Sequence, residues 1–326
     1  MSKTERDPLF FPPSKYPEEG EQPEEYSAEI DPKAQQKGLR LVSIIALVLL
    51  GFILIGIRPA WLHAPWRGAA SGLDGSPAQS SGDSAEISEQ QADRFATLPP
   101  QQQVETLLQL ALRGKPGAPS QILQRAEAWR GKISVTQGLL TQLDAALRSN
   151  DLQLRNAAVE IELAAYNLPR TAATAQSLIA RAEADPATRP ASLWMMGLIG
   201  SRGIAVDRIS ESLLSSLHDP RTETRIHAVD ALAILAAEDS VPALLEALHN
   251  DASTDVRKRA AAGLAHAGLL DHDQRLSAVP VLVRFSAEPA LDPVTRGLVF
   301  QILRELTSEN LPDDASSWQR WYAARK

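Results

Sequence analysis

The sequence predicts an all-α protein built from stacked helix pairs. Alanine and leucine are abundant and aromatic residues make up only 5% of the 326 residues, a composition that favours close-packed helices over a β-sandwich. The sequence also contains an internal repeat, because DPRTETRIHAVDAL at residues 219–232 is similar to DASTDVRKRAAAGL at residues 251–264. Such a repeat is typical of a helix–turn–helix unit that buries its apolar faces only against neighbouring copies.

Two segments before the repeats are predicted to be flexible. Proline and glutamate dominate residues 1–38, and no helical stripe of apolar residues is sustained, so this segment is predicted to be a disordered cytoplasmic tail. Residues 63–99 are rich in glycine, serine, alanine and glutamine. That composition is typical of a flexible linker, which would let a folded domain move away from a bilayer while it stays attached to it.

Between these segments, residues 39–62 are predicted to form a transmembrane helix. The run LVSIIALVLLGFILIGI, residues 41–57, contains no charged residue. At ~1.5 Å per residue it covers roughly 25 Å of a ~30 Å hydrocarbon core, and Arg40 and Arg58 bracket it. A cleaved signal peptide is the alternative, but the preceding residues form a longer and more acidic segment than a usual n-region.

Basic residues near the two ends of the span set its expected orientation. Lys33, Lys37 and Arg40 precede the apolar run, whereas Arg58 and Arg67 follow it. This bias favours a cytoplasmic N-terminus with the repeat domain on the outer or periplasmic side. The alternative is a cytoplasmic repeat domain.

Residues 100–312 are predicted to form about six helix pairs. In SVPALLEALHND, Val241, Leu244 and Leu248 fall on one face of a helix. A turn follows, and then an arginine opens a second helix, preceded in most pairs by an aspartate that is predicted to cap it. The arginines are Arg155, Arg189, Arg225, Arg257 and Arg296, and the aspartates are Asp151, Asp185, Asp255 and Asp292. The predicted pairs cover residues 100–130, 133–167, 171–202, 204–237, 239–268 and 273–308.

The motifs TDVRKRAAAGL, DPVTRGLVFQIL and VPALLEAL resemble HEAT repeats of the armadillo-type superhelix, clearly over residues 133–307 and more weakly over 100–131. This resemblance implies a right-handed α-solenoid, in which second helices rich in small residues lie between equivalent helices of adjacent pairs. The unit DPATRPASLWMMGLIG departs from the pattern because Trp194, Met195 and Met196 replace small residues. Looser or bulkier packing is therefore expected there.

Residues 313–326 are predicted to form a capping helix at the C-terminus. Trp318, Trp321 and Tyr322 recur at helical spacing, so they lie on one face. The last pair of a repeat array needs a cover over its apolar side, which this face would provide. The alternative is an aromatic docking site for a partner.

Composition argues against several classes of function. The chain has no cysteine, which excludes disulfides and thiolate chemistry, and its C-terminal part is close to neutral, which disfavours nucleic-acid binding. No Gly-rich phosphate loop or HExxH motif is present, and the six histidines show no metal-ligand spacing. Neighbouring carboxylates such as Glu160 and Glu162 are interpreted as ordinary residues of a solvated helix face. We predict no catalytic residue, no cofactor and no metal.

The predicted function is that of a membrane-tethered scaffold that binds a protein or peptide through one face of the solenoid. Candidate contact residues are those expected to be exposed on the second helices, namely Arg225, Asp230, Arg257, Lys258 and Arg259. One alternative is a structural subunit of a membrane complex. A further alternative is a lyase-like enzyme of the HEAT fold.

Overall fold

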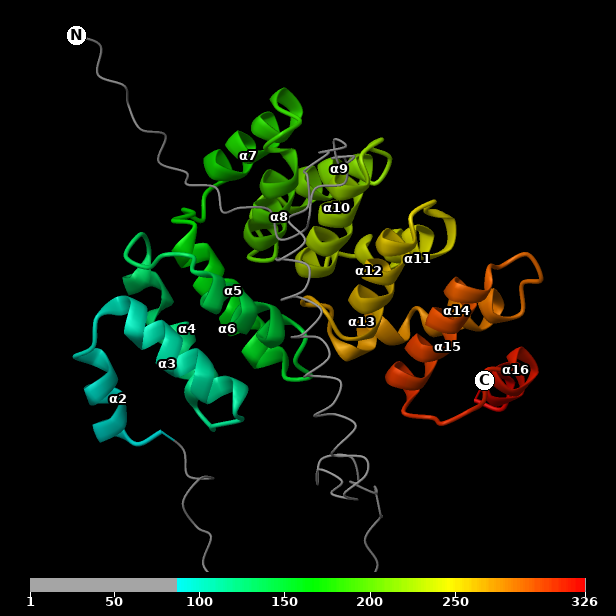
Figure 1. Cartoon of the computed structure of the whole chain (residues 1–326), viewed down its shortest axis with the longest axis horizontal. Helices are drawn as coiled ribbons and strands as arrows, with labels where there is room; N and C mark the ends of the chain where they lie inside the picture. The colour runs from blue at the N-terminus through cyan, green and yellow to red at the C-terminus, as the bar shows by residue number, and fades with distance from the viewer. Residues whose placement is uncertain (1–86, 326) are drawn as a thin grey trace, which may run out of the picture. The chain divides into compact units, whose positions relative to one another are not determined.

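The structure is a computed structural model that describes residues 87–325, and this part of the chain consists of α-helices joined by turns (Figure 1). None of the described helices is long and apolar enough to cross a membrane. The predicted tail at residues 1–38 and the predicted span at residues 39–62 lie outside the described residues, as does most of the predicted linker.

The helices follow one another in pairs, and each of the six predicted ranges contains two of them. The pairs are α3 (Pro100–Leu112) with α4 (Ala118–Trp129), α5 (Gln137–Leu147) with α6 (Leu152–Ala165), α7 (Ala172–Ala184) with α8 (Arg189–Gly200), α9 (Val206–Ser216) with α10 (Thr222–Leu235), α11 (Ser240–Asn250) with α12 (Thr254–Ala265), and α14 (Val279–Ser286) with α15 (Pro293–Thr307). A short helix, α13 (His272–Leu276), joins the last two pairs. Second helices of successive pairs pack together, and Figure 1 shows α8, α10 and α12 side by side.

Aspartate begins two of the second helices as predicted. Asp151 accepts a hydrogen bond from the Gln153 amide at the start of α6, and Asp292 accepts from the first amides of α15. At α12, however, Ser253 is the N-cap and Asp255 lies within the first turn. Asp185 ends α7 instead of beginning α8, because a turn of three residues follows it.

Of the looser or bulkier packing expected for this unit, the structure shows bulky buried residues together with a close contact between α8 and α10. A methyl group added to Gly197 would lie 2.8 Å from the Ala231 carbonyl oxygen, so the two backbones touch at this glycine. Met195 and Met196 are buried beside it. The unbranched methionine side chains are buried in the core while the adjacent glycine allows the two backbones to approach closely.

A weaker junction divides the array into an N-terminal block, residues 100–168, and a C-terminal block, residues 172–323. Helix α6 packs closely on α4 but contacts α8 at few places. The junction is polar, because Glu160 pairs with Arg170 and with Arg202, whose Nε lies 3.0 Å from Glu160 Oε1. Glu160 and Glu162 are therefore buried at the junction and do not lie on a solvated face. Arg170 and Arg202 offset the cost of burying the Glu160 carboxylate, and the Trp194 indole N–H donates to Glu162.

The two blocks also meet through the loop of residues 266–271, which follows α12. The Gly268 amide donates to the Leu147 carbonyl at the end of α5, at 3.3 Å. Arg155, at the start of α6 and only 4% exposed, donates to the carbonyl oxygens of Gly268 (3.0 Å) and Leu270 (3.3 Å). Burial lowers the pKa of the Arg155 guanidinium. Arg275 donates to the Ala265 carbonyl at the start of the loop, and its own burial and the nearby charge of Arg155 lower its pKa to about 10. The second pair is thus fastened directly to the fifth.

Helix α2 (Glu89–Ala96) lies within the range that the sequence predicts as linker, so the linker prediction is wrong at its C-terminal end. Ser88 and Gln91 form a capping box that starts the helix. Ile87 and Phe95 pack against the core, and Arg125 donates to the Ala92 carbonyl at 3.0 Å. These contacts order a stretch whose composition alone favours flexibility.

At the C-terminus, α16 (Ala315–Ala323) packs against α14. Trp318 is fully buried, and its Nε1 donates to the Pro312 carbonyl at 3.1 Å. Trp321 lies edge-on to Trp318, with ring centroids 5.6 Å apart, and it is partly buried together with Tyr322. Trp318 therefore has no surface to offer a partner, whereas its two aromatic neighbours retain some.

His249 links the fifth and sixth pairs. Its Nε2 lies 2.7 Å from Glu288 Oε2 and its Nδ1 lies 2.6 Å from Asn250 Oδ1. Both ring nitrogens can donate only when the imidazole is protonated. The hydrogen bond with Asn250, and then that with Glu288, therefore raise the pKa of His249 although partial burial opposes them.

This arrangement predicts a stabilisation that is lost as the pH rises. A raised folded-state pKa gives its full contribution below the unfolded-state value of 6.5, and the contribution disappears as the pH passes through the folded-state pKa. His249→Gln is expected to lower the free energy of unfolding by up to about 1 kcal/mol near pH 5.5, and by less near pH 8.5. Urea titrations of both proteins at the two pH values measure this. An effect that is the same at both would contradict the prediction.

Candidate functional site

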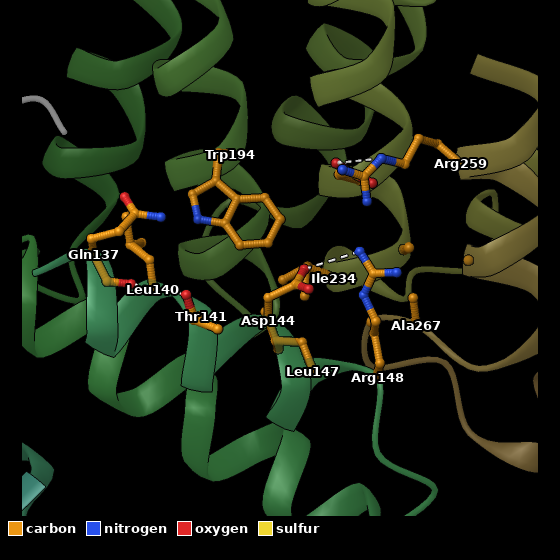
Figure 2. Close-up of a pocket in the computed structure, with 14 residues that line it drawn as sticks. Gln137, Leu140, Thr141, Asp144, Leu147, Arg148, Trp194, Ile234, Arg259 and Ala267 are labelled. Carbon is orange, nitrogen blue, oxygen red and sulfur yellow. Dashed lines mark hydrogen bonds and ion pairs between the residues drawn. The ribbon is translucent and has the colours of Figure 1, made fainter. Parts of the chain in front are cut away.

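One cleft of the described residues lies between α5 on one side and α8, α10 and α12 on the other (Figure 2). Its volume is about 340 Å³, at the small end of the range of ~300–1,000 Å³ that is usual for ligand sites. The wall formed by α5 belongs to the N-terminal block and the opposite wall to the C-terminal block. Gly268 and Leu147, which join the two blocks, also line the cleft.

The α5 wall presents a polar stripe. Gln137, Thr141, Asp144 and Arg148 follow one another at intervals of four, three and four residues, so they share one face of the helix (Figure 2). The Thr141 side chain donates to the Gln137 carbonyl, and Arg148 Nη2 lies 3.1 Å from Asp144 Oδ1. The stripe was not among the predicted contact residues, although its helical spacing is visible in the sequence.

The opposite wall is mainly apolar, with Trp194 as its largest side chain. Figure 2 shows the Trp194 indole across from Thr141 and Asp144, with Ile234 further along the same wall. The Trp194 Nε1 donates to Glu162 of α6, which is 1% exposed, so the ring is fixed at its polar edge. Burial and the Glu162 charge together raise the pKa of Tyr166, which keeps that phenol neutral. Trp194, which departs from the small residues expected in second helices, thus forms part of the cleft wall.

The charges of the cleft form two pairs, one on each wall. Asp144 pairs with Arg148 on α5, and Asp230 of α10 lies 3.9 Å from Arg259 of α12. The formal charge of the lining residues is therefore zero. Within the described residues, no group of three or more His, Cys, Asp or Glu side chains is placed to hold a metal ion.

A ladder of ion pairs runs along the turns between the helices of successive pairs. Arg225 donates from Nε and Nη2 to both carboxylate oxygens of Asp251, at 2.8 and 3.1 Å. In the adjacent pair Arg257 donates to the Asp251 carbonyl at 2.7 Å and lies 3.8 Å from Asp292. Arg189 pairs with Asp219 in the same way one step earlier. Three of the arginines that open second helices, Arg189, Arg225 and Arg257, thus reach the turn of the next pair.

Residues 176–265 and 210–304 of this chain match HEAT repeats. The described structure agrees with that match, since these residues form helix pairs with stacked second helices. No curated protein matches the chain.

The HEAT-repeat packing corrects the expectation that all five candidate contact residues are exposed. The Arg225 and Arg257 side chains are only 14% and 12% exposed, because they form the ladder. Asp230 and Arg259 are partly buried in the cleft wall. Lys258 is exposed but lies outside the lining of the cleft. In this chain Arg225 and Arg257 join neighbouring helix pairs and leave little of their side chains exposed.

The ladder predicts strong coupling between Arg225 and Asp251. A double-mutant cycle with Arg225→Met and Asp251→Asn is expected to give a coupling energy of about 1–3 kcal/mol, because the pair is bidentate and mostly buried. Lys258 and Asp255 form a matched control, since they lie 3.7 Å apart and are more than half exposed. Their coupling energy is expected to stay below about 0.5 kcal/mol. Equal coupling in the two cycles, measured by chemical denaturation, would contradict this assignment.

Proposed function

We propose that this protein is a membrane-tethered HEAT-repeat scaffold that binds a protein or peptide partner in the cleft between α5 and α8–α10–α12. HEAT repeats are typical of scaffolds without catalytic activity. The observation that carries the proposal is the cleft itself, an opening of about 340 Å³ with a polar wall facing a mainly apolar one. Such a mixed lining supports recognition of a segment with both polar and apolar groups.

The tether rests on the sequence alone. The uncharged run at residues 41–57 has the length and composition of a single span, and the basic residues before it favour a cytoplasmic N-terminus. In this arrangement the HEAT repeats lie on the outer or periplasmic side and act at the membrane surface.

Site-specific photocrosslinking in intact cells tests the binding role. A photoreactive residue replaces Thr141 in the cleft of the full chain, and a second variant carries it at Gln301, which is exposed on α15. The scaffold function predicts a discrete protein adduct from position 141 that is absent from position 301. Adducts that are equal at both positions, or none at position 141, would overturn the proposal.

Exchange of the predicted span separates the scaffold from the alternative of a structural membrane subunit. Residues 39–62 are replaced by an unrelated transmembrane helix, and the adduct from position 141 is measured again. A scaffold keeps its adduct, because the span serves only to hold it at the membrane. A subunit whose span packs against other helices loses it.

A further inference from the structure

The geometry points to an uncharged, extended peptide segment as the ligand of the cleft, with one apolar side chain against the Trp194 indole and its backbone along the polar stripe of α5. This inference rests on the proposed binding function and adds the chemical class of the partner segment. It follows from the charges, the two walls and the size of the cleft.

The charges of the cleft select against a charged anchor. Each wall already contains one carboxylate and one guanidinium, at 3.1 Å in the Asp144–Arg148 pair and 3.9 Å in the Asp230–Arg259 pair. An incoming cation or anion would lose its hydration shell, and it would meet a like charge beside each opposite one. A neutral side chain incurs neither cost. The complementary ligand of a cleft with balanced charges is therefore uncharged.

The polar stripe matches the main chain of such a ligand. The Gln137 amide both donates and accepts, and the Thr141 hydroxyl, which donates to the Gln137 carbonyl, can still accept, whereas Asp144 accepts and Arg148 donates. An extended peptide offers alternating N–H and C=O groups at intervals comparable with the spacing between the stripe residues, because its own residues advance ~3.3 Å each along the strand direction. A stripe of mixed donors and acceptors can satisfy this backbone whatever its side chains are.

Trp194 provides the anchor position. Its Nε1 is held by the buried Glu162 carboxylate, so the ring is fixed before a ligand arrives and only its apolar face remains for contact. The cleft volume of about 340 Å³ equals the space of roughly ten water molecules at ~30 Å³ each. That space suits one large side chain with a short length of backbone.

The contact between the blocks keeps the two walls in register. Leu147 at the end of α5 is bonded to Gly268, and Arg155 holds the same loop through its carbonyl oxygens. Because these bonds lie within the protein and join the two walls directly, the fold itself holds the cleft in shape, and binding is expected to order little of the protein.

Selection from a displayed library of random nonapeptides tests this inference, with the full chain in detergent micelles as bait. We expect enriched peptides to carry a central leucine, methionine or phenylalanine in an uncharged segment. Synthetic copies with acetylated and amidated ends then serve as the probes in binding titrations.

Two variants at one exposed position locate the binding. Thr141→Trp fills the cleft and Thr141→Glu adds an unpaired charge to it, so each is expected to weaken the selected peptides at least about tenfold. Ala145→Trp is the matched control, because Ala145 is exposed on the same helix but does not line the cleft. Its affinity is expected to stay within about twofold of the parent.

Enrichment of acidic or basic peptides, or binders that both Thr141 variants leave unaffected, would overturn the inference. Charged binders that are lost in the Thr141 variants would remove only the ligand class and leave the scaffold function standing. Absence of a crosslinked partner in cells, by contrast, counts against the function itself, so the two failures are distinguishable.

Discussion

Replacement of Gly268 by alanine is expected to destabilise the protein by about 3 kcal/mol or more. Gly268 has a φ of +79°, which an alanine adopts only with strain, and its added methyl group would lie 2.3 Å from the Ala233 carbonyl oxygen. The obstacle is backbone of α10, which cannot rotate aside. The substitution therefore forces the 266–271 loop away from α10 and away from Leu147 and Arg155, which bind it.

Gly114 provides the control for the backbone strain alone. It has a φ of +75°, but nothing lies within 4 Å of an added methyl group. Gly114→Ala is therefore expected to cost only about 1 kcal/mol. Urea denaturation of the full chain followed by circular dichroism compares the two variants, and equal costs would show that the 266–271 loop is not packed as described.

Replacement of Arg155 by methionine is expected to cost about 2–4 kcal/mol. The methionine retains the apolar part of the side chain, but the carbonyl oxygens of Gly268 and Leu270 lose a charged donor inside the protein. A buried group without a partner bears its full desolvation cost. The fastening between the second and fifth pairs is lost at the same time.

Arg148→Met is the matched control for this change. Arg148 lies on the neighbouring helix, its side chain is 43% exposed, and its partner Asp144 is one turn away. Its replacement is expected to change the free energy of unfolding by less than about 0.5 kcal/mol. Amide hydrogen exchange of residues 266–271 gives a second measurement, because their protection falls only when this loop is released. Equal stability of the two variants would contradict the role assigned to Arg155.

The helix pairs could be predicted from the sequence because their cause is local. The apolar stripe of Val241, Leu244 and Leu248 buries one face, and the small residues of the following helix let the next pair approach. Cap positions were less certain, since Ser253 and Asp255 can both bond the first amides of α12 and only one occupies the N-cap. Such choices depend on the exact path of the turn.

The cleft could not be predicted, because it depends on contacts between pairs that are distant in sequence. Nothing local indicates that Leu147 lies beside Gly268, or that Glu162 is buried under Trp194. Two signals were visible in the sequence: the departure of Trp194 from the small residues found at equivalent positions, and the helical spacing of the polar stripe on α5. Likewise, the sequence alone predicts that the arginines of the ladder are exposed, because it does not show that the turn of the next pair packs against them.

The bond between Arg155 and Gly268 joins residues 113 positions apart in a type of array whose pairs normally contact only their neighbours. A duplicated or deleted pair between them would change the distance that this bond must span. Gain or loss of a single pair in this stretch is therefore expected to break the bond. The same bond connects the second pair to the fifth. The helix pairs between them are therefore expected to unfold together, and not one after another from one end of the array.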